Sequence, residues 1–421
     1  MEYDDSDLSR LDSVGLAEVI RSGDLSSEEV IEASIKRIEA MDGDLNAVVT
    51  RRFERALEDA AGDIPDGPFQ GVPFLLKDLW TCSADEPMHL GNKALKDINY
   101  VSPIESDMAR RYREAGFIVI GRTNTPEFGL VGTTEPESYG PSRNPWNTDY
   151  GTGGSSGGAA AAVASGMVPS ANASDGGGSI RIPAAMCGLV GLKPSRGRVP
   201  MGPLQEEWGL SIQHVVSHSM RDAAAILDAT AFPTMGDGVV APTHGQPYIG
   251  QINTNPGKLR IGLWNESPRD DLELHEDCKK LTQVTAELLE SLGHHVDEAH
   301  PPALDDPGIG GRFSAIWMAG ANLTLQNVGR LLGRDVTIDD VEIGTWLMGQ
   351  HGSTTSGLEV MQAQAAMGAM RRATLQWWEE GWDLLLTPTT LQPPPRIGDL
   401  TSTEDDPMRN SMRSIPYAAY T

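Results

Sequence analysis

The sequence has 421 residues, of which 39% are hydrophobic, and it contains 46 Gly and 28 Pro; this composition is typical of a globular protein with many loops and excludes a fibrous or disordered chain. The 33 Lys and Arg residues against 59 Asp and Glu residues give a formal net charge of -26, which disfavours binding to nucleic acids or anionic membranes. Three cysteines without CxxC spacing indicate neither a disulfide framework nor a zinc site.

The N-terminus, MEYDDSDLSR, is acidic and has no apolar export signal, and no stretch reaches about 18 consecutive apolar residues. We therefore expect a cytoplasmic protein without a membrane span. The acidic, Lys-poor composition resembles that of proteins from salt-loving organisms. This hypothesis predicts that the folded fraction falls when salt is dialysed away.

The first helix signal is a capping box formed by Ser26 and Glu29, followed by isoleucines at helical spacing. Residues 71–76 (GVPFLL) predict a buried strand, which ends abruptly at Lys77 and Asp78. Lys77 is thus expected at the carboxyl end of that strand, although a salt bridge to Asp78 is an alternative role for it.

A helix over 105–114, followed by Gly116 and a strand over 117–120, indicates alternation of helices and strands. Further along the chain, the sequence predicts helices over 159–164 and 279–292, and strands over 258–263 and 383–386. The fold class is therefore α/β, with a central mixed sheet flanked by helices on both faces.

We find no internal repeat and no long linker, so one domain is expected over residues 1–421. Its core motifs lie in 71–200. The more polar and irregular region of about 201–382 is expected to form variable walls around a substrate.

Residues 151–200 are rich in Gly, Ala and Ser, and two phosphate-binding motifs can be excluded there. No GxxxxGK[ST] spacing occurs, and GxGxxG fails because Ser156 stands in the place of the last glycine. A flexible linker is disfavoured because the intervening Ala and Val residues indicate burial.

The residues Gly153, Ser155 and Gly157 do satisfy GxSxG, the nucleophile elbow of α/β-hydrolases. That elbow follows an apolar strand, whereas residues 143–150 (RNPWNTDY) look like a loop. We therefore set this alternative aside.

Ser155 and Ser179 are each embedded in glycine, which permits unusual backbone geometry. The N–H groups of Gly176, Gly177 and Gly178 could converge beside Ser179 as an oxyanion hole. A serine nucleophile needs a base, and the motif contains no His. A lysine can serve as that base if burial or neighbouring groups favour its neutral form.

The runs GGSSGG, DGGGSIRIPA and LLKD resemble the amidase signature family, as do GRTNTPEFG (121–129), SRNPWN (142–147) and DLLLTPT (383–389). This resemblance implies a Ser-Ser-Lys triad in which Ser179 is the nucleophile, Ser155 the bridging serine, often attached through a cis peptide, and Lys77 the general base. It also implies an oxyanion hole at Gly176, Gly177 and Gly178, and mainly structural roles for Asp175 and Arg181.

The resemblance implies hydrolysis of amide C–N bonds through an acyl-enzyme, with no metal or organic cofactor. We expect a small-molecule amide substrate, no nucleic-acid or membrane partner, and a homodimer as the assembly to test. The segments 133–147 and 192–203 look closest to bacterial hydrolases of cyclic amides and nylon oligomers. Trp317 and Asn322, on an expected helix, are candidate substrate contacts, although a core stripe is the alternative.

Two other functions stay open. An amidotransferase A subunit, which hydrolyses glutamine for partner subunits acting on charged tRNA, would share the triad. An inactive fragment or non-catalytic family member is the other, because about seventy residues resembling the family's C-terminus are expected to be missing after Thr421.

Overall fold

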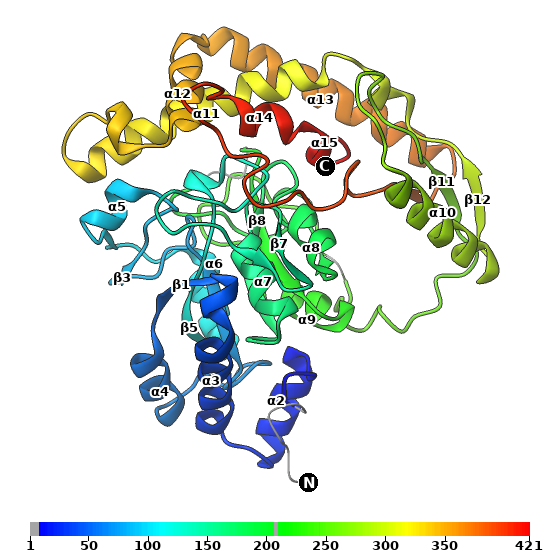
Figure 1. The fold of residues 1–421 in the computed structure, drawn as a ribbon. Coiled ribbons are helices and arrows are strands. Elements are labelled where there is room, and N and C mark those ends of the chain that lie inside the picture. The colour runs from blue at the N-terminus through cyan, green and yellow to red at the C-terminus, as the bar shows by residue number, and fades with distance from the viewer. Residues whose placement is uncertain (1–7, 206–208, 244) are drawn as a thin grey trace. The chain divides into compact units, whose positions relative to one another are not determined.

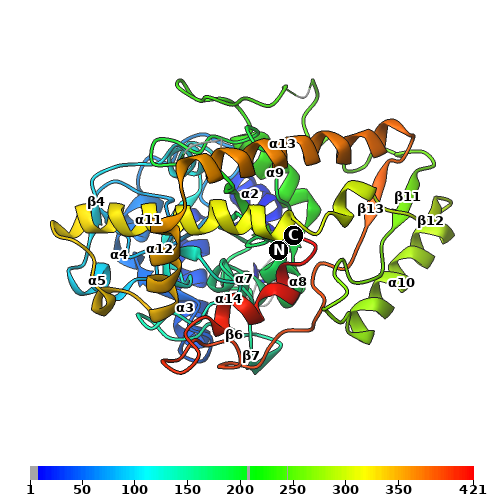
Figure 2. The same cartoon turned by 90° about the horizontal axis from the view of Figure 1, so that it is seen from above.

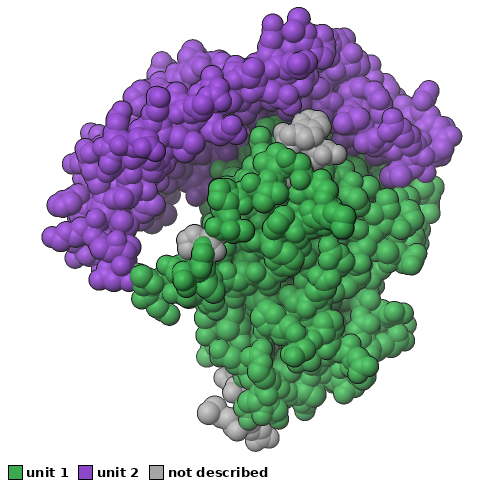
Figure 3. Space-filling view, turned by 180° about the vertical axis from the view of Figure 1, so that it is seen from behind, with its two compact units in different colours: residues 1–254, 394–400 green, residues 255–393, 401–421 purple. Residues whose placement is uncertain are grey.

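The computed structural model describes residues 8–205, 209–243 and 245–421, and these fall into two compact units (Figure 3). Unit 1 comprises Met1–Thr254 and Pro394–Leu400, and unit 2 comprises Asn255–Pro393 and Thr401–Thr421. The expected single domain over 1–421 stays a prediction, because grouping by contacts does not establish which part folds independently.

Unit 1 is built on a six-stranded mixed sheet with the strand order β1-β5-β2-β8-β10-β9. The central strands β5, β2 and β8 are parallel, whereas β1, β10 and β9 join antiparallel to their neighbours. Its strands are β1 (Val48–Arg51), β2 (Pro73–Lys77), β5 (Ile118–Thr123), β8 (Ser170–Asp175), β9 (Val190–Gly191) and β10 (Ile212–Ser217).

Helices cover both faces of this sheet, as the alternation of side chains along β2 shows. Leu75 packs in one core with helices α3, α4, α7 and α8, whereas Phe74 and Leu76 pack in a second core with α2, α6 and α9. Figure 1 shows several of these helices around the strands. Their bounds are α2 (Ser13–Ser22), α3 (Ser27–Leu45), α4 (Phe53–Ala61), α6 (Asp107–Glu114), α7 (Gly157–Ala164), α8 (Arg181–Cys187) and α9 (Met220–Thr230).

The sequence signals in the first half are confirmed. Ser26 and Glu29 form the capping box of α3, with both reciprocal hydrogen bonds present. Strand β2 is buried at every position and ends at Lys77. The Ala-rich helix α7 lies against backbone, since a Cβ atom at Gly158 would stand 2.4 Å from the backbone nitrogen of Asn124.

The loop expected over residues 143–150 is wrong in part. Strands β6 (Arg143–Asn144) and β7 (Asn147–Gly151) pair antiparallel in a separate two-stranded sheet. Polar turn residues concealed this hairpin, whose first three β7 residues are exposed. It lies outside the central sheet, so the apolar strand that a nucleophile elbow follows is not found there.

The shorter elements of unit 1 are β3 (Glu86–Pro87), α5 (Lys93–Asp97), β4 (Val101–Ser102) and the 3₁₀ turn η1 (Glu127–Gly129).

Unit 2 contains a three-stranded parallel sheet with the order β12-β11-β13. Its strands are β11 (Arg260–Leu263), β12 (His295–Glu298) and β13 (Leu384–Leu386), and helix α10 (Glu276–Ser291) connects the first two. The expected strands at 258–263 and 383–386 and the helix at 279–292 are thereby confirmed, with ends shifted by a few residues.

The more irregular structure expected for much of 201–382 is wrong for the second part of that region, although the helix expected to carry Trp317 and Asn322 is present as part of α11. Three long helices occupy most of 309–379, and Figure 2 shows α11 and α13 along their lengths. The remaining elements of unit 2 are η2 (Pro302–Asp305), α11 (Ile309–Leu332), η3 (Ile338–Asp340), α12 (Ile343–Thr354), α13 (Gly357–Glu379), α14 (Arg409–Arg413) and α15 (Ile415–Ala418). Among the helices of the described ranges, none combines the length and apolarity needed to cross a membrane.

Candidate active site

Lys77 stands at the carboxyl end of the buried strand β2 and is fully buried itself. Its Nζ atom lies within hydrogen-bond distance of three hydroxyl oxygens, at 2.7 Å from Ser155 Oγ, 2.9 Å from Ser156 Oγ and 3.0 Å from Ser174 Oγ. The structure therefore joins Lys77 and Ser155, two residues that sequence reasoning selected 78 positions apart.

The surroundings of this amine favour its neutral form. Burial lowers the pKa of Lys77 from 10.5 to about 7, because a charged group loses hydration there, and the negative charge of Asp175 opposes this shift in part. A lysine with such a pKa is available as a base near neutral pH.

Asp78 does not pair with Lys77 among the described residues. Its carboxylate accepts the backbone N–H groups of His89 (2.9 Å) and Gly91 (3.4 Å) instead. Burial raises the pKa of Asp78, and Arg122 is the main opposing charge. The alternative of a simple salt bridge between Lys77 and Asp78 is therefore not supported.

Ser155 lies in the glycine-rich loop that precedes α7, and its peptide bond with Gly154 is cis, in agreement with the family resemblance. Thr134 Oγ1 donates to the carbonyl of Gly153 (2.9 Å) and accepts the N–H of Gly157 (3.1 Å), so one hydroxyl holds the loop on both sides of Ser155. This role of Thr134 was missed, because no local motif connects it with the later loop.

Ser179 follows β8 after residues 176–178 and is separated from the start of α8 by Ile180. The carboxylate of Asp175 accepts the N–H groups of Gly178 (2.7 Å) and Ile180 (3.1 Å), which flank the serine. Arg181 binds the same carboxylate through Nε (2.9 Å) and Nη2 (2.8 Å). The ion pair thus fixes the turn that carries Ser179, consistent with the structural roles that the resemblance implies for Asp175 and Arg181.

The chain from Lys77 through Ser155 to Ser179 is present in its first link only. Within the described residues, no hydrogen bond joins Ser179 Oγ to Ser155 Oγ. Ser179 is 9% exposed, against 0% for Lys77 and 1% for Ser155, so the expected nucleophile is the most accessible of the three. Hydrogen bonds between catalytic groups often shorten only when substrate binds, so the second link stays a prediction.

The oxyanion hole expected at Gly176, Gly177 and Gly178 also stays a prediction. The N–H of Gly178 already donates to Asp175 Oδ1. Gly178 has a φ of 116°, a conformation that side chains rarely adopt, so its glycine is needed to form the turn.

Ser156 and Ser174 were missed as partners of the lysine. Ser156 occupies the N-cap position of α7, yet its side chain makes no capping bond. Its Oγ atom contacts Lys77 Nζ and the backbone of Ser174 instead. The pair SS in the motif was the available signal for Ser156, whereas Ser174 carried none.

Trp317 and Asn322, the candidate substrate contacts, lie half-buried on α11 in unit 2. The Trp317 ring stacks on Phe313, with 5.2 Å between ring centroids. The Asn322 amide donates to the carbonyl of Gly349 (3.0 Å) and accepts from Gln326 (2.8 Å). These contacts occupy both side chains within unit 2, and their predicted role toward substrate stays untested.

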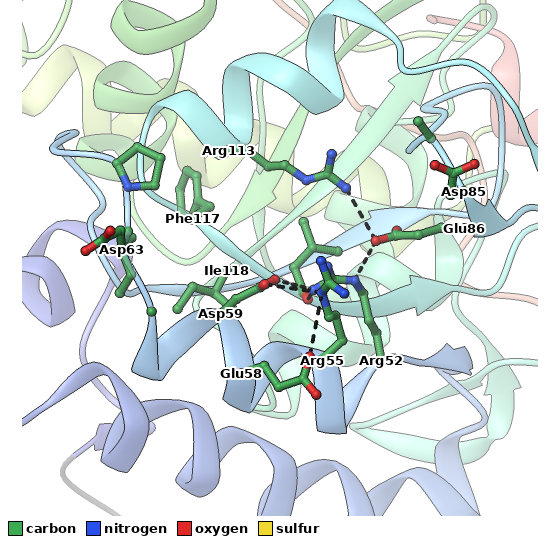
Figure 4. A pocket seen from close by; sticks show the side chains of 15 residues that line it. Arg52, Arg55, Glu58, Asp59, Asp63, Asp85, Glu86, Arg113, Phe117 and Ile118 are labelled. Atoms are coloured by element: carbon green, nitrogen blue, oxygen red, sulfur yellow. Dashed lines mark hydrogen bonds and ion pairs between the residues drawn. The ribbon is translucent and has the colours of Figure 1, made fainter.

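A pocket of about 790 Å³ in unit 1 is a separate feature, shown in Figure 4. Arg52 and Arg113 both bind Glu86 there, and Arg52 also binds Asp59 at 2.7 Å. None of the three triad residues lines it. Because it lies apart from Lys77, Ser155 and Ser179, the reaction is not assigned to this pocket. Among the described residues, no cluster of three or more His, Cys, Asp or Glu side chains is suited to hold a metal ion.

Most of this chain matches a known protein family. A family model described as Amidase matches residues 29–420. A 6-aminohexanoate-cyclic-dimer hydrolase of Paenarthrobacter ureafaciens is 39% identical over 393 residues, which cover 92% of this chain and 79% of that protein.

Two solved structures are also similar. A 6-aminohexanoate cyclic dimer hydrolase complexed with substrate superposes with a TM-score of 0.94 at 37% identity, covering 99% of this chain and 87% of the other. A bacterial aryl acylamidase of the amidase signature family superposes with a TM-score of 0.83 at 28% identity, covering 92% and 81%. The likeness extends over nearly the whole chain and includes the segments that carry Lys77, Ser155 and Ser179.

Proposed function

This chain belongs to the amidase family and hydrolyses amide C–N bonds, and from that premise we propose that it does so through an acyl-enzyme on Ser179, with Ser155 as proton bridge and Lys77 as base. The observation that carries the proposal is the 2.7 Å contact between Lys77 Nζ and Ser155 Oγ inside a fully buried site.

In the first half-reaction, Ser179 Oγ attacks the amide carbonyl carbon and its proton passes through Ser155 to Lys77. The carbonyl oxygen becomes an oxyanion, which backbone N–H groups at Gly176 and Gly177 would stabilise. The C–N bond then breaks, and the proton returns along the same path to the departing amine, because an amide anion is a poor leaving group.

In the second half-reaction, water attacks the ester of Ser179. Its proton moves to Lys77 by the same route, and the carboxylic acid product leaves as Ser179 is regenerated. Lys77 accepts and releases one proton in each half-reaction, which a pKa of about 7 suits near neutral pH. The scheme uses no metal or organic cofactor.

For the substrate, we infer a small-molecule amide, and amides of 6-aminohexanoate units are the first class to test, because relatives at 37–39% identity are named for their cyclic dimer.

We further infer a cytoplasmic location. We also infer no nucleic-acid or membrane partner, because a net charge of -26 repels anionic surfaces. A homodimer is the assembly to test by light scattering. Copurification with partner subunits of a tRNA-dependent amidotransferase would contradict a stand-alone amidase.

Labelling with a serine-reactive fluorophosphonate, followed by intact-mass measurement, tests the nucleophile. We expect one adduct on the wild type and none on Ser179→Ala. Ser353→Ala, which alters an exposed serine of α12, is the matched control and should label like the wild type. Full labelling of Ser179→Ala would overturn the assignment of Ser179.

A further inference from the structure

The number of hydrogens on Lys77 Nζ determines which of the three surrounding hydroxyl groups accept a hydrogen bond from it and which donate one to it. A protonated lysine has three N–H donors, one for each of Ser155, Ser156 and Ser174. The neutral amine that the mechanism needs has two N–H donors and one lone pair. One of the three hydroxyls must then donate to the nitrogen, and the reaction requires that this donor is Ser155.

Ser156 is held as an acceptor by its other contacts. Its Oγ atom donates to the carbonyl of Ser174 and accepts the N–H of the same residue, each at 3.3 Å. Since a hydroxyl has a single hydrogen, the Ser156 hydroxyl has none left for Lys77. One N–H of the neutral amine is therefore directed to Ser156.

The distances separate the two remaining hydroxyls. Hydrogen bonds that a hydroxyl donates to an oxygen are typically about 2.7–2.8 Å long, whereas those that an N–H donates to an oxygen are typically about 2.9–3.0 Å, so a hydroxyl donor gives the shorter contact. Ser155 lies at 2.7 Å from the nitrogen and Ser174 at 3.0 Å. These lengths fit donation by Ser155 and acceptance by Ser174.

We propose that Ser156 and Ser174 are positioning residues that accept the two N–H groups of neutral Lys77 and thereby direct its lone pair at Ser155. The inference rests on the proposed function, because it assumes that Lys77 acts through Ser155. Ser174 is the better position to test, because its Oγ atom has Lys77 as its sole hydrogen-bond partner within the described chain. Ser156, by contrast, also binds backbone.

The test is the rate of fluorophosphonate labelling of Ser174→Ala as a function of pH and probe concentration. Loss of one acceptor disfavours the ammonium, so we expect the midpoint of the acidic limb to fall by about one pH unit. Loss of alignment should lower the limiting rate constant about tenfold, with little change in probe affinity. The negative charge of Asp175, which raises the pKa of Lys77, is present in both the wild type and Ser174→Ala. It therefore does not account for a difference in midpoint between them.

Ser170→Ala is the matched control, since Ser170 lies on the same strand but its hydroxyl pairs with Ser13 at 2.8 Å. It should leave midpoint and rate constant unchanged. Ser174→Thr restores a hydroxyl and should recover the wild-type profile. If Ser174→Ala does not fold, Ser174→Cys places a weaker acceptor at the same position and should show the same shift in smaller degree.

A wild-type midpoint and rate constant in folded Ser174→Ala and Ser174→Cys would overturn this inference while leaving the proposed function intact. Full activity of Ser155→Ala or Lys77→Met would instead overturn the proposed function. A role of Ser174 limited to folding would reduce the labelled fraction without moving the midpoint, and this result would also count against the inference.

Discussion

Asn172 Oδ1 accepts the backbone N–H of Lys77 at 3.2 Å, so a side chain of β8 fixes the last residue of the neighbouring strand β2. The two strands share only one paired position, Leu75 with Ala171, before the site. The Asn172 amide continues the ladder where backbone pairing has ended. The position of the base thus depends on a neutral, fully buried side chain.

Replacing Asn172 with Ala should lower the free energy of unfolding by about 1–3 kcal/mol, because the buried N–H of Lys77 would lose its acceptor. It should also reduce the rate of labelling of Ser179. Urea denaturation followed by circular dichroism measures the first effect. Asn147→Ala, at an exposed position of β7, should change stability by no more than about 0.5 kcal/mol. Equal losses in the two variants would contradict the role of Asn172.

The rate of amide hydrolysis should rise with pH and reach half its limiting value near pH 7. The neutral amine of Lys77 is the active base, and its pKa of about 7 means that protonation below this pH removes the base. A pH-rate profile of kcat/KM measures this midpoint. Lys77→Met should lose activity at every pH, and a wild-type profile without an acidic limb near neutrality would contradict the proposed role.

Asp175→Asn separates two effects of one carboxylate. Asp175 raises the pKa of Lys77, so its neutralisation should move the acidic limb to lower pH. The same change removes the ion pair with Arg181 and weakens the turn around Ser179, so the limiting rate should fall. Arg269→Gln, which breaks an exposed ion pair with Asp271, should leave the profile unchanged. A limb that moves to higher pH would contradict this account.

Gly158→Ala should destabilise the protein by about 3 kcal/mol, because the added Cβ atom would overlap backbone atoms. That atom would stand 2.4 Å from the nitrogen of Asn124 and 2.7 Å from the carbonyl oxygen of Ala47. Gly43→Ala, in α3 with no atom within 4 Å of the new Cβ, should instead stabilise the protein by about 0.5–1 kcal/mol. Thermal denaturation of both variants tests the contrast; similar melting temperatures would refute it.

The first half of the fold was predictable because its signals are local. The apolar run before Lys77 predicted β2, and the capping box at Ser26 predicted α3. Helix α12 of unit 2 was missed for a physical reason. Gly349 and Gly352 on α12 look like helix breakers in the sequence, yet they permit close contact with α11: a Cβ atom at Gly352 would stand 1.8 Å from the carbonyl oxygen of Met318.

The residues of the candidate site also fall into two groups, those that a local sequence pattern marks and those that it does not. Ser155 and Ser179 were found because each lies in a glycine-rich motif, and Lys77 because it ends a buried strand. Ser174 lies 97 positions from Lys77 in sequence, and nothing nearby marks it. Thr134 is likewise joined to Gly153 only by the fold. A residue that acts through a long-range contact can be recognised from the sequence only where a local pattern also marks it, as for Lys77 and Ser155.

Within the described residues, the hydrogen-bond partners of the Lys77 amine are hydroxyl groups, and this has a consequence for how reversibly the amine exchanges protons. A lysine paired with a carboxylate would have to break an ion pair each time it released a proton. The carboxylate would then be left as an unpaired negative charge in the protein interior. With serines as neighbours, loss of the proton requires only that one O–H bond rotates. Lys77 can therefore take up and release a proton repeatedly with little rearrangement of its surroundings, as two cycles of proton uptake and release per turnover demand.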